Sequence, residues 1–350
     1  MAKTPDFIRP QDQKNLVIGG NFDFWQRGTS VTYTGTSSGI LRVADRFLSS
    51  WQTTGSSALT FAQSTDVPVT APVTAQYSFK ATSTAYGLSG TTDYIVPIDH
   101  KIEGEFFKDI SGTTMTFSFW FKASIVGTYS FVLKNGSAAR SYVTTFVISS
   151  ASTWQFITIP VVRDAAGTWA TDNTTGMEIS IGSLGGSTTQ APTLGSWQSG
   201  NYFSASTATA WAATTGATIQ IAQLMLNQGS VAAPFVLAGG SYAGELALCQ
   251  RYYNCCNPGA SGSVENSTTT LAVSYKHPIQ MRASPTLKIS GPVYVRYQDG
   301  DLTTASQTLQ NTTTSVYGGW TQVAGFSGLT ANSPIWDRGN YNWLWADAEL

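Results

Sequence analysis

Two carboxylates, Glu103 and Glu105, are the residues of this chain best placed for hydrolytic chemistry. If they lie on a strand, they face the same side of a sheet, about 6–7 Å apart. Glycoside hydrolysis needs two carboxyl groups about 5 Å apart, or roughly 6.5–9.5 Å apart in inverting enzymes. The spacing of the pair therefore leaves a polysaccharide-cleaving activity open.

The chain has few histidines and cysteines with which to build a catalytic or metal site. The sequence holds two histidines, His100 and His277, and its three cysteines, Cys249, Cys255 and Cys256, form one tight cluster. A structural zinc site commonly uses two separated pairs of ligands, and adjacent cysteines bridge each other only with strain. We therefore expect no metal and no cofactor, and we interpret the cysteines as small buried apolar residues.

Aromatic side chains in polar loops are suited to binding sugars, because a sugar stacks its C–H face on a ring while polar side chains fix its orientation. The chain has 11 Trp. The loop candidates are Trp169, Trp197, Tyr202 and Trp211 in the first part of the chain, and Trp320, Trp336 and Tyr341 in the second. Four other tryptophans lie in or beside apolar strand patterns and are expected in the core: Trp25, Trp51, Trp120 and Trp154.

The composition excludes several classes of protein. Charged residues make up 11% of the 350 residues, hydrophobic residues 42% and aromatic residues 12%, with a net charge of -1. Nucleic-acid binding needs clustered basic side chains, and the 19 Lys and Arg are spread evenly. No run of about 20 apolar residues is present to span a membrane, and no secretory signal is visible at the N-terminus.

Short alternating segments between polar turns predict an all-β chain without intervening helices. In residues 115–121, Phe117, Phe119 and Phe121 are expected to face one side of a strand and Trp120 the other. The Asn135–Gly136 pair predicts a hairpin. Further strands are expected at residues 16–18, 129–133, 142–148, 154–159, 177–181 and 219–226. The pattern indicates an antiparallel sandwich or jelly roll, and the polar connections of residues 182–216 are where binding usually occurs.

The domain organisation follows from one predicted helix at residues 244–253, where Leu246, Cys249 and Tyr253 share a face. We predict an N-terminal arm (1–14), a jelly-roll β-sandwich (15–238), a short linking α-helix (239–258) and a smaller C-terminal β-sandwich (259–350). The C-terminal part has candidate strands at residues 269–275, 286–290, 293–297, 316–324 and 342–346.

Several stretches resemble bacteriophage tail-fibre and related virion proteins that carry a carbohydrate-binding-module-like jelly roll. These stretches are residues 15–28 (NLVIGGNFDFWQRG), 44–47 (ADRF), 102–104 (IEG), 115–124, 223–235 (QLMLNQGSVAAPF), 245–253, 281–286 (MRASPT) and 345–350 (WADAEL). The resemblance covers nearly the whole chain from Asn15. It implies a virion location, adhesion to a host surface and a homotrimer.

The resemblance also bears on metal binding. Jelly rolls of this type often hold a structural calcium with an early acidic residue and an Asp in the last strand. Asp23 is present, but residues 221–223 (IAQ) carry no acidic side chain. Calcium needs six or more oxygen ligands, so no metal site is assigned.

Three functions are weighed on this basis. The first is a non-enzymatic phage fibre protein that recognises a host surface glycan, attached to other tail or capsid proteins through its N-terminal arm, with neither nucleic acid nor membrane insertion involved. The second is a capsid or tail decoration protein with an assembly role alone. The third, a polysaccharide depolymerase, is disfavoured because the chain shows no β-helix repeat. The adhesin is the reading that we adopt.

Overall fold

The computed structural model describes residues 14–69, 75–108, 110, 114–256, 262–264, 268–290, 293–297, 300–304, 306–337 and 343–350. All of the predicted N-terminal arm except Lys14 lies outside the described residues. The chain divides into two compact units, one formed by Met1–Glu245 with Leu350 and the other by Leu246–Glu349. The fold is all-β, as predicted, with few helices.

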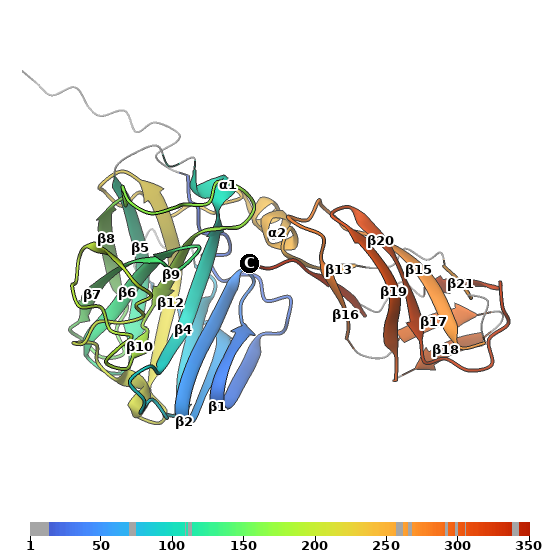
Figure 1. The fold of residues 1–350 in the computed structure, drawn as a ribbon, viewed down its shortest axis with the longest axis horizontal. Coiled ribbons are helices and arrows are strands. Elements are labelled where there is room, and N and C mark those ends of the chain that lie inside the picture. The colour runs from blue at the N-terminus through green and yellow to red at the C-terminus, as the bar shows by residue number, and fades with distance from the viewer. Residues whose placement is uncertain are drawn as a thin grey trace, which may run out of the picture. The chain divides into compact units, whose positions relative to one another are not determined.

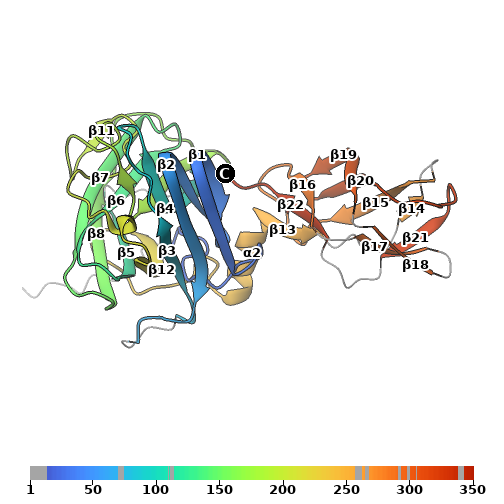
Figure 2. The ribbon, with the colours of Figure 1, turned by 90° about the horizontal axis from the view of Figure 1, so that it is seen from below.

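The first unit is built around one sheet that folds over into two layers (Figure 1, Figure 2). Along the main path the order is β11-β7-β6-β9-β4-β2-β3-β12-β5-β8, while β1 pairs with β2 and β10 pairs with β4. The strands are β1 (Ser30–Arg42), β2 (Phe47–Ser64), β3 (Ser78–Ala85), β4 (Tyr94–Glu103), β5 (Thr114–Ala123), β6 (Gly127–Asn135), β7 (Arg140–Ile148), β8 (Gln155–Val162), β9 (Thr175–Ile181), β10 (Leu184–Gly185), β11 (Trp197–Ser199) and β12 (Thr218–Gln228).

The long strand β2 carries the sheet from one layer to the other. Its first half pairs with β4 between Phe47 and Gln52, and its second half pairs with β3 between Ala58 and Ser64. The layers then meet through aromatic side chains from strands that are far apart in the sheet order. Because every such ring is removed from water, this contact supplies much of the stabilisation of the sandwich.

The alternation predicted for β5 is confirmed. Phe117, Phe119 and Phe121 are all buried in the core. Phe119 lies 6.2 Å from the Phe131 ring of β6 and 5.5 Å from the Phe146 ring of β7. The predicted hairpin is also present, since β6 and β7 pair antiparallel across the turn that follows Asn135.

Two local predictions are wrong. Residues 16–18 form no strand, because only isolated backbone bonds such as Leu16 N–H to Leu226 O attach this segment to β12. Glu103 and Glu105 do not share a strand face, since β4 ends at Glu103 and Glu105 lies in the short helix α1 (Gly104–Phe107). The Glu103 side chain is buried, whereas Glu105 is exposed and pairs with Lys108 at 2.9 Å. The pair therefore lacks the geometry on which the hydrolytic hypothesis depended.

The predicted linking helix is present as α2 (Tyr242–Gln250), although Tyr253 belongs to the next strand rather than to the helix. Glu245 lies in the first turn of this helix, where an acidic side chain complements the helix dipole, and it also has a more specific role. Its carboxylate accepts hydrogen bonds from the backbone N–H groups of Gly19 and Gly239, both at 2.6 Å. Neither helix described in the chain is long and apolar enough to cross a membrane.

The second unit is a smaller β-sandwich, as predicted. One sheet has the order β13-β22-β16 and the other β18-β17-β21-β14-β15-β20-β19. Its core includes Leu271, Val323 and Trp343. The strands are β13 (Tyr253–Cys256), β14 (Gly262–Val264), β15 (Thr270–Lys276), β16 (Thr286–Ile289), β17 (Val293–Tyr297), β18 (Gly300–Thr304), β19 (Thr308–Ser315), β20 (Gly318–Ala324), β21 (Pro334–Asp337) and β22 (Leu344–Asp347).

Two phenylalanines on opposite faces of the same layer provide a test of this packing. Phe119→Ala should lower the free energy of unfolding of the first unit by about 3–5 kcal/mol, because it leaves a cavity in the core. Phe156→Ala, on the outer face of β8 where the ring is 49% exposed, should cost less than about 1 kcal/mol. Urea titration followed by tryptophan fluorescence measures both. Equal losses for the two variants would contradict the assignment of faces.

Candidate functional site

The long polar connection between β10 and the short helix η2 (Trp211–Ala213) is here called the strap (residues 186–210). It crosses the outer face of the β7–β6 layer and contributes β11 to the edge of that layer, beside β7. Ala191 and Ala205 of the strap pack against Val132 and Val143 of those strands. The backbone N–H of Ala205 donates to Ser130 Oγ at 3.0 Å. The strap is therefore a packed part of the fold.

A buried ion pair lies beneath the strap. Lys134 Nζ is 2.7 Å from Glu178 Oε1, and the Lys134 side chain is 3% exposed. The same ammonium group lies 4.0 Å from the centre of the Phe203 ring, which is itself stacked on Tyr94 at 3.9 Å. Because a buried cation needs both a counter-ion and shielding from water, these contacts fix Phe203, and with it the strap, against the sheet.

Asp99 lies one strand away from Glu178 on the same face of the sheet, where its Oδ1 accepts a hydrogen bond from Ser180 Oγ at 2.9 Å. Burial, and then the nearby Glu178 carboxylate, raise the pKa of Asp99 to about 8. A raised carboxyl pKa beside a second carboxylate is a feature of catalytic acids. However, Asp99 is 2% exposed, so a glycosidic oxygen cannot reach it in this conformation.

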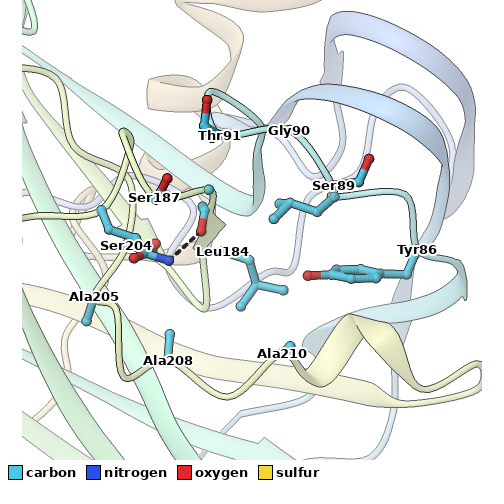
Figure 3. Close-up of a pocket in the computed structure, with 14 residues that line it drawn as sticks. Tyr86, Ser89, Gly90, Thr91, Leu184, Ser187, Ser204, Ala205, Ala208 and Ala210 are labelled. Atoms are coloured by element: carbon cyan, nitrogen blue, oxygen red, sulfur yellow. Dashed lines mark hydrogen bonds between the residues drawn. The ribbon is translucent and has the colours of Figure 1, made fainter.

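Beside the strap, the structure has a cavity of about 340 Å³. Figure 3 shows Tyr86 on one side of it with its hydroxyl pointing toward Leu184, and Ser204 and Ala205 on the opposite side. The lining comes from the loop between β3 and β4, from the segment that begins at β10, and from the end of the strap. Its size is within the usual range for a small-ligand pocket.

Backbone contacts hold the walls of this cavity in place. The Asp93 carboxylate accepts hydrogen bonds from the N–H groups of Thr54, Ser89 and Gly90, at 3.1, 2.9 and 2.7 Å. The N–H of Gly186 donates to Asp93 O at 2.7 Å. A Cβ at Gly186 would lie 2.3 Å from the carbonyl oxygen of Gly90, so the close approach of the two loops requires glycine at this position.

The cavity is lined by neutral groups. None of its fourteen lining residues is charged. Burial, and then the Asp93 carboxylate, raise the pKa of Tyr86, which keeps its hydroxyl protonated and able to donate. The Gln190 amide donates to Gly185 O at 2.8 Å. The lining thus offers a ring face, hydroxyls and an amide, which suits a neutral polar ligand with apolar C–H faces.

Ser204 is the polar group of this cavity that the protein leaves unsatisfied. Its side chain is 1% exposed, and its buried Oγ has no hydrogen-bond partner in the described structure. A Cβ at Gly185 would lie 2.8 Å from that oxygen, so a side chain at this position would crowd the hydroxyl. Since a buried hydroxyl without a partner costs free energy, Ser204 is an unsatisfied group in the wall of the cavity.

Among the predicted sugar-binding aromatics, Trp211 is a wrong prediction. It is 1% exposed, and its indole N–H donates to Gly182 O at 3.0 Å. Because η2 folds back onto the sheet, the ring belongs to the core. Trp169 and Trp197 are brought together, with ring centres 5.3 Å apart and perpendicular planes. Both are partly buried, and their N–H groups donate to Ala166 O and Val162 O, so they connect neighbouring loops.

The remaining candidates are dispersed. Tyr202 packs against the small apolar cluster beneath the strap. Trp320 is 38% exposed on β20 in the second unit. Trp336 lies in the backbone of β21, and Tyr341 lies outside the described residues. Tyr202 is not among the residues that line the cavity beside the strap.

The tryptophans expected in the core divide into two groups. Trp25 is buried in the main core, which confirms its prediction, and Trp51 packs partly against that core while stacking on Tyr33 at 3.9 Å. Trp120 and Trp154 were wrongly placed. Trp120 is on the outer side of β5, against Phe156 of β8, and Trp154 donates its N–H to Asp66 at 3.1 Å.

Sequence reasoning missed Tyr86 and Ser204, the two residues that give the cavity its chemistry. The polar connection of residues 182–216 was predicted to carry binding, and it supplies most of the lining. A signal for the other wall was available in residues 86–90 (YGLSG), where a tyrosine is followed by two glycines in a polar turn. No pattern in the sequence indicated that these two loops, more than 90 residues apart, lie side by side.

No group of three or more metal-ligating side chains occurs among the described residues. None of the three cysteines forms a disulfide in the described structure, and Cys249 and Cys256 are buried, whereas Cys255 is partly exposed. Burial, followed by the neighbouring Cys255, raises the pKa of Cys256 to about 12, so this thiol stays protonated at neutral pH. It is therefore a poor nucleophile and a poor metal ligand.

No protein-family model and no curated protein sequence matches the chain. Solved structures that are similar to it include the enzymatically active domain of tailspike protein 4 from bacteriophage CBA120, at 11% identity and a TM-score of 0.32. That alignment covers 61% of this chain and 21% of the tailspike chain, so this chain spans about a fifth of that relative's length.

Carbohydrate-binding modules are also among the similar structures. A family 11 module from Clostridium thermocellum, in complex with a mixed-linked tetrasaccharide, aligns at 12% identity over 59% of this chain and 91% of its own, with a TM-score of 0.27. The module CBM4 aligns at 14% identity over 61% of this chain and 99% of its own, with a TM-score of 0.29. None of these likenesses identifies what this chain binds.

The buried Asp99 predicts a specific pH dependence of stability. Its folded-state pKa is above the unfolded value near 4, so its stabilising contribution is fully present below about pH 4 and lost as the pH rises through about 8. Asp99→Asn keeps the oxygen that accepts from Ser180 but cannot ionise. Relative to wild type, its unfolding free energy should rise between pH 5 and 8, by up to about 1.4 kcal/mol per pH unit.

Urea titrations of both proteins at several pH values measure this difference. Wild type and variant both contain the buried His100 and His277, so the opposite effect of those histidines at acid pH cancels. A constant difference between the two proteins from pH 5 to 9 would contradict the assignment of Asp99 as a protonated acid.

Two buried serines should respond differently to the loss of their hydroxyl. Ser204→Ala should leave the free energy of unfolding within about 0.5 kcal/mol of wild type, because the hydroxyl has no partner to lose. Ser49→Ala removes a buried donor to Val96 O at 2.8 Å and should cost about 1–2 kcal/mol. Chemical denaturation compares them, and a large loss for Ser204→Ala would show that its hydroxyl has a structural partner.

Proposed function

We propose that this protein is a non-enzymatic glycan-binding protein of a phage virion, a fibre protein that adsorbs to a host surface polysaccharide. The observation that carries the proposal is the uncharged cavity beside the strap, which is lined by the Tyr86 ring together with neutral hydroxyl and amide side chains. A sugar offers C–H faces to the ring and hydroxyls to the polar groups of the lining.

The absence of enzymatic activity is supported by the arrangement of the carboxylates. Glu103 and Glu105 lie on different elements, one buried and one exposed. Asp99 is buried, and the nearby Glu178 carboxylate, with its side chain 16% exposed, is paired with Lys134. The cavity itself has no carboxylate among its lining residues. Binding without cleavage is what such a lining can do, because protonation of a glycosidic oxygen needs an acid within hydrogen-bond reach.

The virion location, the homotrimer and attachment through residues 1–14 are parts of the same proposal, and they rest on the resemblance of the sequence to phage fibre proteins. Three linked copies would multiply a weak sugar contact into strong adhesion. A purely structural role in the particle is the second candidate. It is supported by Val231, which is 75% exposed in the segment that follows β12 and is available for docking to another protein.

A retention experiment tests the proposal. The full chain is passed over immobilised bacterial capsular polysaccharide and lipopolysaccharide, and the eluate is assayed for new reducing ends. We expect retention, no new reducing ends, and about tenfold weaker binding for Tyr86→Ala, which removes the ring of the cavity.

Tyr317→Ala is the matched control, because this tyrosine is 66% exposed and belongs to the second unit. Its retention should equal that of wild type. If wild type is retained on no polysaccharide, the adhesin reading falls and the structural role replaces it. Release of reducing ends would instead make the protein an enzyme.

A further inference from the structure

The outer face of the other layer, formed by β1, β2, β3, β12, β5 and β8, carries a row of hydroxyls in register. Thr32 pairs with Thr60, Thr60 with Thr82, and Thr82 with Thr218. Ser124 continues the row, because its Oγ accepts from the Thr218 N–H at 2.8 Å. Each of these residues is at least partly exposed. Neighbouring strands are about 4.8 Å apart, so the hydroxyls form a regularly spaced line across the strands.

An aromatic border lies on the same face. Trp120 of β5 and Phe156 of β8 are directly paired across the two strands, and their ring centres are 5.3 Å apart. Trp120 is partly exposed and Phe156 is 49% exposed. Along β5, Trp120 is four residues from Ser124, which places the rings about 13 Å from the row of hydroxyls.

A fixed polar cluster lies between the hydroxyls and the rings. Asp66 accepts hydrogen bonds from Lys122 Nζ at 2.6 Å, Trp154 Nε1 at 3.1 Å and Gln220 Nε2 at 3.2 Å. Burial acts to raise its pKa, but these three donors hold the pKa of Asp66 below its usual value. Lys122 Nζ also lies 5.9 Å from the centre of the Trp154 ring. The middle of the face is therefore polar and held in one arrangement.

We infer that this face is a second saccharide site, and that it takes an extended polysaccharide chain rather than a single sugar. The inference rests on the proposed function in that both sites bind glycan. The row that crosses its strands is made of hydroxyls, whereas the core of a protein–protein interface is more apolar. A ligand that reaches both the rings and the hydroxyl row must span about 13 Å, which requires several linked sugars. The cavity beside the strap, in contrast, accommodates a short segment.

Two ligand lengths separate the two sites. The probes are the capsular polysaccharide or lipopolysaccharide O-chain that retains wild type, and the single repeating unit released from it. Affinity electrophoresis measures binding to the polymer, and calorimetry measures binding to the repeating unit. Trp120→Ala and Phe156→Ala should each weaken polymer binding about tenfold and leave binding of the repeating unit unchanged. Tyr86→Ala should weaken both.

Val162→Ala is the matched control, because Val162 is 66% exposed on the same strand, β8, but lies beyond both the rings and the hydroxyl row. It should bind the polymer like wild type. Phe156→Ala guards against misfolding, since its ring is already half in water. If both aromatic variants bind the polymer like wild type while Tyr86→Ala does not, the second site is overturned and the proposed function stands. If wild type binds no polysaccharide, both proposals fall.

Discussion

The cavity of the first unit depends on one buried cation, Lys134. In the interior its ammonium group is stable only with Glu178 as counter-ion and with water kept out. The Phe203 ring provides the cover, 4.0 Å from the Lys134 nitrogen. Moving Phe203 away from the sheet would therefore expose the Lys134–Glu178 ion pair to water. Ser204 is the next residue along the chain, so the contact that shields the lysine also fixes this part of the cavity wall.

The scarcity of charge in the chain has a structural counterpart in this region. Several of its charged side chains hold parts of the fold together. Lys134 pairs with Glu178, Arg140 pairs with Asp164 at 2.8 Å, and Asp93 accepts hydrogen bonds from backbone N–H groups of the loop that lines the cavity. Ion pairs on a surface contribute little, whereas a buried carboxylate that loses its donors is costly. The few charges therefore stabilise loops, and hydroxyls and amides remain to face a ligand.

The sequence predicts the layers of this protein better than its sites, and the tryptophans explain the difference. Period-two alternation in β5 correctly placed Phe117, Phe119 and Phe121 inside, and the same alternation places Trp120 outside. The residue type of Trp120 suggested the core, but the alternation along the strand was the better predictor of its position. The prediction for Trp211 was wrong for the opposite reason. Its neighbours in the sequence are polar and give no sign that η2 folds back onto the sheet. Tyr86 and Ser204 come to line the same cavity only through tertiary contacts between two loops, which no local sequence pattern encodes.

The same strand register determines both which side chains pack in the core and how the hydroxyls align on the outer face. A slip of one residue in β3 relative to β2 would turn Phe79 toward water and Thr82 toward the core, while Phe61 and Thr60 of β2 kept their faces. The burial of those two phenylalanines thus sets the alignment of the hydroxyls on the other face. The bulges of the β1–β2 and β2–β3 pairs fall outside the paired threonines, so the row remains continuous. The row of hydroxyls needs no loop to build it, because the packing of the core already determines where each hydroxyl lies.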